Sequence, residues 1–260
     1  MVESVEQELQ EEEYSIPYHY LLSKESLIAF PRTLQIAPAY LYYLEKVLFL
    51  MDELDDSKSL LDVGCGDGRL IWELRKRNCQ ASLQGADFSK RAIDFARVLN
   101  PGVSFDVVDL TDRLSLPKAE FDVVVSMEML EHIPLAQVEV VIENLAHLTR
   151  TGGQLILTVP HVNRNLDKKH YQHFDSQSLR KILLKKFDSV DLFGFYRQSV
   201  MNILFHCIVV TYYFMYPIRK IGAKFVTDSI SKAGFGYFQK YLSDCGPDEG
   251  NSLIAVCRKA

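Results

Sequence analysis

The stretch Asp62-Val63-Gly64-Cys65-Gly66-Asp67-Gly68 decides how this chain folds. It follows a short apolar run at 59–64 and precedes a helical pattern at 68–78, which predicts a strand, a glycine-rich turn and the start of a helix. Backbone N–H groups in such a turn, together with the helix N-terminus, bind polar ligands. The dinucleotide-binding pattern GxGxxG requires glycine at position 69, where this chain has Arg69, so another ligand is indicated.

The pattern on either side of this turn predicts an α/β fold. Apolar runs at 59–64, 81–87, 103–109, 121–127 and 152–159 alternate with helical patterns at 68–78, 89–99 and 135–149. This alternation favours right-handed crossovers and a parallel sheet with helices on both faces. We expect a further helix at 38–54, with Pro38 in its first turn, and two late strands at 189–195 and 252–257.

The chain divides into three parts. Residues 1–56 form an N-terminal tail and helical cap, residues 57–197 and 250–260 the ligand-binding domain, and residues 198–249 a long insertion before the last strand. The apolar stretch 200–216 contains His206 and falls short of the ~20 residues of a spanning helix. Because basic residues follow it, we expect a lid or a peripheral membrane contact at 200–224, with an extra core helix or a dimer contact as alternatives.

Composition narrows the location and the partners. The five cysteines are odd in number and scattered without a CxxC pair, which indicates reduced thiols rather than disulfides or a zinc site. No basic segment followed by an apolar run marks a secretory signal, so a cytoplasmic protein is expected. The net charge of −5 gives no overall attraction for nucleic acid and favours a small-molecule or lipid-like acceptor.

The turn Asp-x-Gly-x-Gly-x-Gly resembles motif I of class I S-adenosylmethionine-dependent methyltransferases. The resemblance implies a seven-stranded Rossmann-like sheet and S-adenosyl-L-methionine as cofactor. It also implies that Asp87 holds the ribose hydroxyls, that Phe88 lies against the adenine, and that Asp109 and the Leu110 N–H contact the adenine. The expected cofactor-binding residues are Asp62, Gly64, Cys65, Gly66, Gly68, Asp87, Phe88, Asp109, Leu110 and Met127.

A second motif follows the fourth expected strand. In 127–134, Glu128, Glu131 and His132 have the i, i+3, i+4 spacing that shares one face of a helical turn. Two carboxylates and an imidazole can hold a divalent cation or supply a general base. The stretch resembles ubiquinone-biosynthesis O-methyltransferases and, more weakly, small-RNA 3′-end 2′-O-methyltransferases, in which this spacing binds a metal with a later histidine.

A later histidine pair, His170 and His173, is present here. We therefore take Glu131, His132 and His173 as candidate catalytic residues, and Glu128, Glu131, His132 and His173 as candidate metal ligands. In the alternative interpretation His132 only caps or packs.

The resemblance implies transfer of a methyl group to oxygen, on a small-molecule, lipid or glycan-linked hydroxyl. The Asn/Asp-Pro-Pro-aromatic motif of base-amine methylation is absent after the fourth strand. One alternative is metal-dependent RNA 3′-terminal 2′-O-methylation, with lysines 168, 169, 181, 185 and 186 forming a phosphate-binding face. Lys169, Gln172 and Asp175-Ser176 depart from that family's signature. Another alternative is a non-catalytic cofactor-binding assembly subunit.

Overall fold

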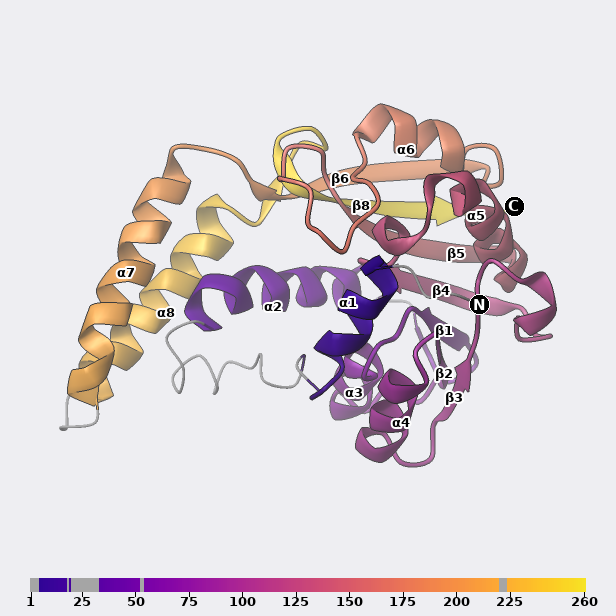
Figure 1. Ribbon diagram of the computed structural model, residues 1–260, viewed down its shortest axis with the longest axis horizontal. Coiled ribbons are helices and arrows are strands. Elements are labelled where there is room, and N and C mark those ends of the chain that lie inside the picture. Colours follow the sequence, from indigo (N-terminus) through magenta and orange to yellow (C-terminus); the bar gives the residue numbers. More distant parts are fainter. Residues whose placement is uncertain (1–4, 18, 20–32, 52–53, 220–223) are drawn as a thin grey trace.

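The computed structural model describes residues 5–17, 19, 33–51, 54–219 and 224–260, and it confirms the α/β fold (Figure 1). The strands form one sheet in the order β3-β2-β1-β4-β5-β8-β6-β7. They are β1 (Ser59–Val63), β2 (Ser82–Asp87), β3 (Ser104–Val107), β4 (Phe121–Met127), β5 (Thr149–Pro160), β6 (Ser189–Arg197), β7 (Asp244–Cys245) and β8 (Gly250–Arg258). The sheet has eight strands where seven were expected, because the two-residue β7 of the insertion pairs with β6.

Eight α-helices occur in the described residues. They are α1 (Val5–Glu13), α2 (Thr33–Phe49), α3 (Arg69–Lys76), α4 (Lys90–Leu99), α5 (Val138–Leu148), α6 (Ser176–Leu183), α7 (Met201–Arg219) and α8 (Lys224–Tyr241). The 3-10 turns are η3 (Arg113–Ser115), η4 (Leu130–His132) and η5 (Leu135–Gln137). Since α2 begins at Thr33 and ends at Phe49, Pro38 lies beyond its first turn, and the helix expected at 38–54 is displaced towards the N-terminus.

The sheet separates two hydrophobic clusters because successive strand residues point to opposite faces. Leu61 of β1 and Val124 of β4 belong to the cluster beneath α5 and α6. Their neighbours Leu60 and Val123 belong to the cluster beneath α2, α3 and the base of α7 and α8. Helices therefore cover both faces, as the alternating pattern predicted.

The direction of the strands fixes where ligands meet the sheet. Strands β1 to β5 run parallel in their pairings, and β8 runs antiparallel to both β5 and β6, so β6 shares the direction of the parallel strands. Their carboxyl ends therefore share one edge, where open α/β sheets bind ligands. We call it the carboxyl edge.

The insertion forms a helical hairpin on this same edge. The chain leaves β6 at the carboxyl edge, runs through α7 and α8, and returns to the start of β8 at that edge. Figure 1 shows α7 and α8 projecting from the sheet, with α2 between the hairpin and the strands. Among the described residues, no helix has the length and apolar character needed to cross a membrane.

Candidate functional site

The glycine turn between β1 and α3 has the conformation that its sequence predicts. Gly66 and Gly68 have φ angles of 53° and 80°, in the left-handed region that favours glycine. A Cβ atom at Gly68 would lie 2.7 Å from Nδ2 of Asn100, which donates a hydrogen bond to the Gly68 carbonyl oxygen at 3.2 Å. The turn is therefore closely packed, and a side chain at position 68 would clash with Asn100.

Buried carboxylates surround the turn. Asp87, at the end of β2, accepts hydrogen bonds from the backbone N–H groups of Gly66 and Ser89, each at 2.9 Å. Burial raises the pKa of Asp87 to about 6, and these two bonds oppose the rise. Burial raises the pKa of Asp62 to about 8, and the charges of Asp87 and Asp67 raise it further. Such a concentration of buried carboxylates suits a cationic ligand.

A cavity of about 220 Å³ joins this turn to the second motif. Of the residues expected at the cofactor, Asp62, Gly64, Cys65 and Met127 line it, and of those expected at the acceptor, Glu128, Glu131 and His132 do. The remaining wall comes from the N-terminal region, the start of α3 and the segment after β5, namely Tyr14, His19, Tyr40, Tyr43, Leu44, Arg69, Leu70, Arg164, Asp167, Lys169 and His170.

Phe88, Asp109 and Leu110 lie past the ends of β2 and β3 and, like Gly66, Gly68 and Asp87, they do not line this cavity. Phe88 follows β2 and is 43% exposed. Strand β3 ends at Val107, so Asp109 lies two residues past the strand rather than at its end. The Asp109 carboxylate accepts hydrogen bonds from the N–H and hydroxyl of Thr111, and the Leu110 carbonyl accepts one from Asn144 at 2.7 Å.

Glu128 leaves β4 in a left-handed conformation, with φ at 47°. The helical turn therefore begins only at Leu130, and the prediction of one helical turn through Glu128 is wrong. The Tyr43 hydroxyl donates to Glu128 Oε1 at 2.7 Å, and Glu128 N donates to Thr158 Oγ1 at 3.1 Å. Burial raises the pKa of Glu128. Tyr43 was not predicted at this site, because in the sequence it belongs to an apolar helical stripe that indicates only packing.

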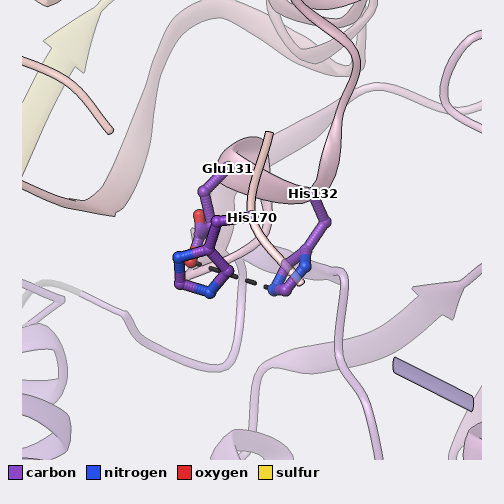
Figure 2. A group of neighbouring side chains, drawn as sticks. All are labelled: Glu131, His132 and His170. Atoms are coloured by element: carbon purple, nitrogen blue, oxygen red, sulfur yellow. Dashed lines mark ion pairs between the residues drawn. The ribbon is translucent and has the colours of Figure 1, made fainter. Parts of the chain in front are cut away.

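The structure brings Glu131, His132 and His170 together (Figure 2). One ligand atom from each lies within 4.8 Å of the others, and His132 Nε2 lies 4.0 Å from Glu131 Oε1. The sequence named His173 for this place. Instead, His170 occupies it, and His173 lies behind it with its Nε2 2.9 Å from His170 Nδ1.

Hydrogen bonds fix the tautomers of these histidines. A carbonyl oxygen can only accept, so His132 Nδ1, 3.0 Å from the Lys169 carbonyl, carries the proton. By the same reasoning His173 Nδ1 donates to the Arg164 carbonyl at 3.1 Å, its Nε2 accepts, and His170 Nδ1 donates to it. Nε2 of both His132 and His170 is therefore left with a lone pair.

Burial keeps both imidazoles neutral near pH 7. It lowers the pKa of His132 to about 4 and that of His170 to about 3. For His170, the charges of His132 and His173 add to the effect of burial. Neutral imidazoles with an available lone pair can accept a proton or bind a metal ion.

Glu131 is the unsatisfied member of the group. It is 1% exposed, and neither of its carboxylate oxygens has a hydrogen-bond partner among the described residues. Burial and the charge of Glu128 raise the pKa of Glu131 well above its usual value. A buried carboxylate without a partner is unfavourable, and a divalent cation between Glu131, His132 and His170 would relieve it.

Tyr14 and His19 of the N-terminal segment lie against the glycine turn. His19 donates its backbone N–H to the buried Asp67 carboxylate at 3.2 Å, and its Nδ1 lies 3.0 Å from the other oxygen. Arg69 donates to the His19 carbonyl at 2.7 Å. A Cβ atom at Gly66 would lie 2.9 Å from the Tyr14 hydroxyl. These two residues of the expected N-terminal cap thus lie directly against the turn.

Some of the lysines considered as a phosphate-binding face form ion pairs within the protein. Lys185 forms an ion pair with Glu139 of α5 at 2.6 Å, and Lys186 forms one with Glu143 at 3.0 Å. The acidic residues of α5 therefore offset the charge of two of the five lysines of this face.

Comparisons with known proteins agree with this geometry. Residues 36–192 match a family model described as a methyltransferase domain. A ubiquinone biosynthesis O-methyltransferase from Nitrosomonas europaea is 31% identical over 153 residues, which cover 57% of this chain and 61% of the relative. The chain thus spans about three fifths of the length of such curated relatives.

Two solved structures share the fold. A SAM-dependent methyltransferase from Archaeoglobus fulgidus has a TM-score of 0.56 at 13% identity and covers 84% of this chain and 93% of its own. Magnesium protoporphyrin IX methyltransferase from Synechocystis PCC 6803, solved with bound SAM, has a TM-score of 0.53 at 17% identity over 100% of both chains.

Proposed function

The chain belongs to the class I S-adenosylmethionine-dependent methyltransferases, and we propose that it methylates a hydroxyl oxygen of a small or lipid-like acceptor. The observation that carries the proposal is the single cavity shared by Asp62 and Gly64 of the cofactor turn and by His132. S-adenosylmethionine supplies an electrophilic methyl group on its sulfonium. Its positive charge suits the buried carboxylates at the turn, and Asp87 is our acceptor for its ribose hydroxyls.

His132 is our candidate general base. Its Nδ1–H is held by the Lys169 carbonyl, so its Nε2 lone pair is the one available to the acceptor. When the methyl group moves from the sulfonium to the acceptor oxygen and leaves a neutral thioether behind, His132 Nε2 would take up the hydroxyl proton. The imidazole is neutral at pH 7, so its lone pair is available, while burial lowers its pKa to about 4 and makes it a weaker base than an exposed histidine. General-base help contributes typically about 10²–10⁴ in rate.

A divalent cation is the alternative to a base at His132, because the Nε2 lone pair cannot bind a metal ion and accept a proton at the same time. The partnerless oxygens of Glu131 and the Nε2 atoms of His132 and His170 are a suitable donor set, with Glu128 beside them. A divalent ion held there would supply Lewis-acid activation of a hydroxyl group. In this assignment His170 takes the ligand position for which the sequence suggested His173.

Oxygen is favoured over nitrogen by the name of the curated relatives, ubiquinone biosynthesis O-methyltransferase. A small acceptor is favoured over RNA, because ion pairs with α5 engage Lys185 and Lys186 of the basic face that an RNA backbone would need. Catalysis is favoured over a purely cofactor-binding role, because the cavity that reaches the cofactor turn is also lined by Glu131, His132 and His170, which can act as a base or hold a metal ion.

The test measures methyl transfer from labelled S-adenosylmethionine to a soluble catechol, a polyprenyl phenol and a short RNA, with and without EDTA. We expect transfer to the phenolic acceptors and a loss of about 10²–10⁴ in His132→Ala. His147→Ala, at an exposed position on α5, is the matched control and should retain full activity. Transfer to RNA alone would overturn the proposal, and so would full activity in His132→Ala.

A further inference from the structure

We propose that the α7–α8 hairpin docks on the surface of an anionic lipid bilayer and so brings the carboxyl edge to an acceptor dissolved in that membrane. The docking inference rests on the hairpin alone, and only the nature of the acceptor rests on the proposed function. Its grounds are an exposed apolar stripe, an excess of basic residues, and the position of the hairpin beside the site.

The apolar stripe follows one face of α7. Ile203, Cys207 and Val210 are exposed and recur at the three- and four-residue spacing of a helix face, and Leu204 lies beside them. Ile203 is 65% exposed, whereas the neighbouring Phe205 is 1% exposed and packs into the core. Val200, directly before the helix, is 77% exposed. A run of exposed apolar side chains indicates a contact surface.

Charge decides which contact this surface fits. Residues 201–241 contain five basic residues and one acidic residue, although the whole chain has a net charge of −5. On α8, Lys232 and Lys240 are exposed. An apolar stripe combined with basic residues is the composition of helices that lie in the interface of anionic membranes. A second copy of the same hairpin would bring like charges together, which disfavours a dimer through this surface.

The position of the hairpin links the membrane to the site. The Tyr42 hydroxyl of α2 donates to Gln239 Oε1 of α8 at 3.2 Å, and the Tyr42 ring stacks on Phe238 at 5.8 Å. The next residue of α2, Tyr43, donates to Glu128 in the cavity. One helix therefore separates the hairpin from the acceptor side of the cavity, and both lie on the carboxyl edge. A bilayer contacted by α7 would thus be close to the place where the acceptor reacts.

Vesicle sedimentation tests the inference with the full chain. Vesicles of phosphatidylcholine alone are compared with vesicles that also contain phosphatidylglycerol. We expect binding to the mixed vesicles, and much weaker binding to the neutral ones. The double change Ile203→Ser and Val210→Ser should weaken binding at least about tenfold, because apolar surface no longer leaves water. The double change Lys232→Glu and Lys240→Glu should weaken it and remove its salt dependence.

Matched controls and the oligomeric state keep the outcomes separate. Leu114→Ser, at a 95% exposed position on η3, and Lys181→Glu, at an exposed position on α6, should bind like the wild type. No binding to mixed vesicles would overturn the inference. So would a stable dimer that Ile203→Ser and Val210→Ser convert to monomers.

Methyl transfer to the soluble catechol distinguishes a failed docking inference from a failed function. Full transfer without vesicle binding overturns only the docking inference. Vesicle binding without transfer to any phenol overturns only the proposed function. The hairpin variants should retain transfer to the soluble catechol, because none of the changed residues lines the cavity described above.

Discussion

The Asp87 carboxylate holds the glycine turn and is our candidate acceptor for the ribose hydroxyls of the cofactor. It already accepts two backbone hydrogen bonds, from Gly66 and Ser89, and a ribose diol would add further donors. Asp87→Ala should weaken S-adenosylmethionine binding by about 1.5–3 kcal/mol, the value of hydrogen bonds to a charged group. Isothermal titration calorimetry measures this change, and an unchanged affinity would remove Asp87 from the site.

The pKa of Asp87 also predicts a dependence on pH. Burial raises this pKa from 3.8 to about 6, so the ionised acceptor is present above pH 6 and is lost as the pH falls through that value. Cofactor affinity should therefore drop below pH 6. Protonation in this window stabilises the folded state, so the drop does not arise from unfolding at Asp87. Circular dichroism at each pH checks the fold, and Asp87→Asn should flatten this part of the profile.

A substitution at Gly66, compared with one at Gly102, distinguishes the effect of backbone strain from the loss of ligand contact. Gly66→Val places a branched side chain where backbone must meet the cofactor, and its Cβ would also crowd the Tyr14 hydroxyl. Gly102→Val is the matched control, since Gly102 also has a positive φ, 87°, but has open space around it. Both variants should lose about 1–2 kcal/mol of stability from strain. Only Gly66→Val should lose cofactor binding, and normal binding by this variant would mean that the turn has been misassigned.

His173 should act through His170 rather than at the acceptor. It holds Nδ1 of His170 and leaves Nε2 for a metal ion, which makes it a positioning residue. His173→Ala should raise the metal concentration needed for half-maximal activity about 10–100-fold, with kcat near normal at saturation. His170→Ala should lose activity that added metal does not restore. Full activity of the wild type in EDTA, with no metal detected by mass spectrometry, would eliminate the cation.

At the scale of elements, periodicity and the glycine turn predicted most of the fold. The strand expected at 121–127 coincides with β4, and the other expected strands of the sheet differ from the observed ones by a few residues at their ends. Alternation could predict these elements because each buries neighbouring side chains on opposite faces. It could not predict β7, whose two residues pair only because the hairpin returns beside β6.

Parts of the site could not be predicted from the sequence either, because they depend on how distant segments of the chain meet. The choice between His170 and His173 depends on the path of the segment after β5 and on the Arg164 carbonyl, which accepts from His173. The left-handed φ of Glu128 is rare for a side chain of that size. His19 reaches Asp67 from 48 residues away, a contact that no local pattern reports.

The N-terminal segment should control how fast the cofactor leaves. His19 is bonded to buried Asp67 through both its backbone N–H and its ring, so Asp67→Asn should loosen the segment. The loss of about 1–1.5 kcal/mol predicts roughly tenfold faster dissociation. Stopped-flow fluorescence of Trp72, the one tryptophan in the sequence, measures this rate.

Glu45→Ala is the control for that experiment. Glu45 of α2 forms an exposed ion pair with Arg77 at the end of α3. This ion pair does not involve the N-terminal segment. Its removal should leave the dissociation rate unchanged. Equal rates in Asp67→Asn and in the wild type would show that the segment does not hold the cofactor.

At the scale of the whole molecule, the hairpin and the sheet share one hydrophobic core. Phe238 of α8 is fully buried, and its ring lies 5.1 Å from that of Tyr196 and 6.1 Å from that of Phe195, both on β6. On the hairpin side it lies 5.6 Å from Phe205 of α7. The exposed stripe of α7 therefore belongs to a helix whose base is anchored in the body of the protein.

This shared core predicts that the hairpin and the sheet unfold together. Phe238→Ala removes a fully buried aromatic ring and should lower the free energy of unfolding by about 3–5 kcal/mol. Far-ultraviolet circular dichroism follows the helices. Trp72 fluorescence reports on α3, which packs on the sheet. Both midpoints should fall together, because loss of packing at Phe238 is felt by one cooperative unit. Ile203→Ala, at a 65% exposed position on α7, should change stability by no more than about 0.5 kcal/mol. An early loss of helix signal with an unchanged Trp72 midpoint would instead mean that the hairpin folds independently of the sheet. The inferred link from α8 through α2 to the cavity would then be wrong.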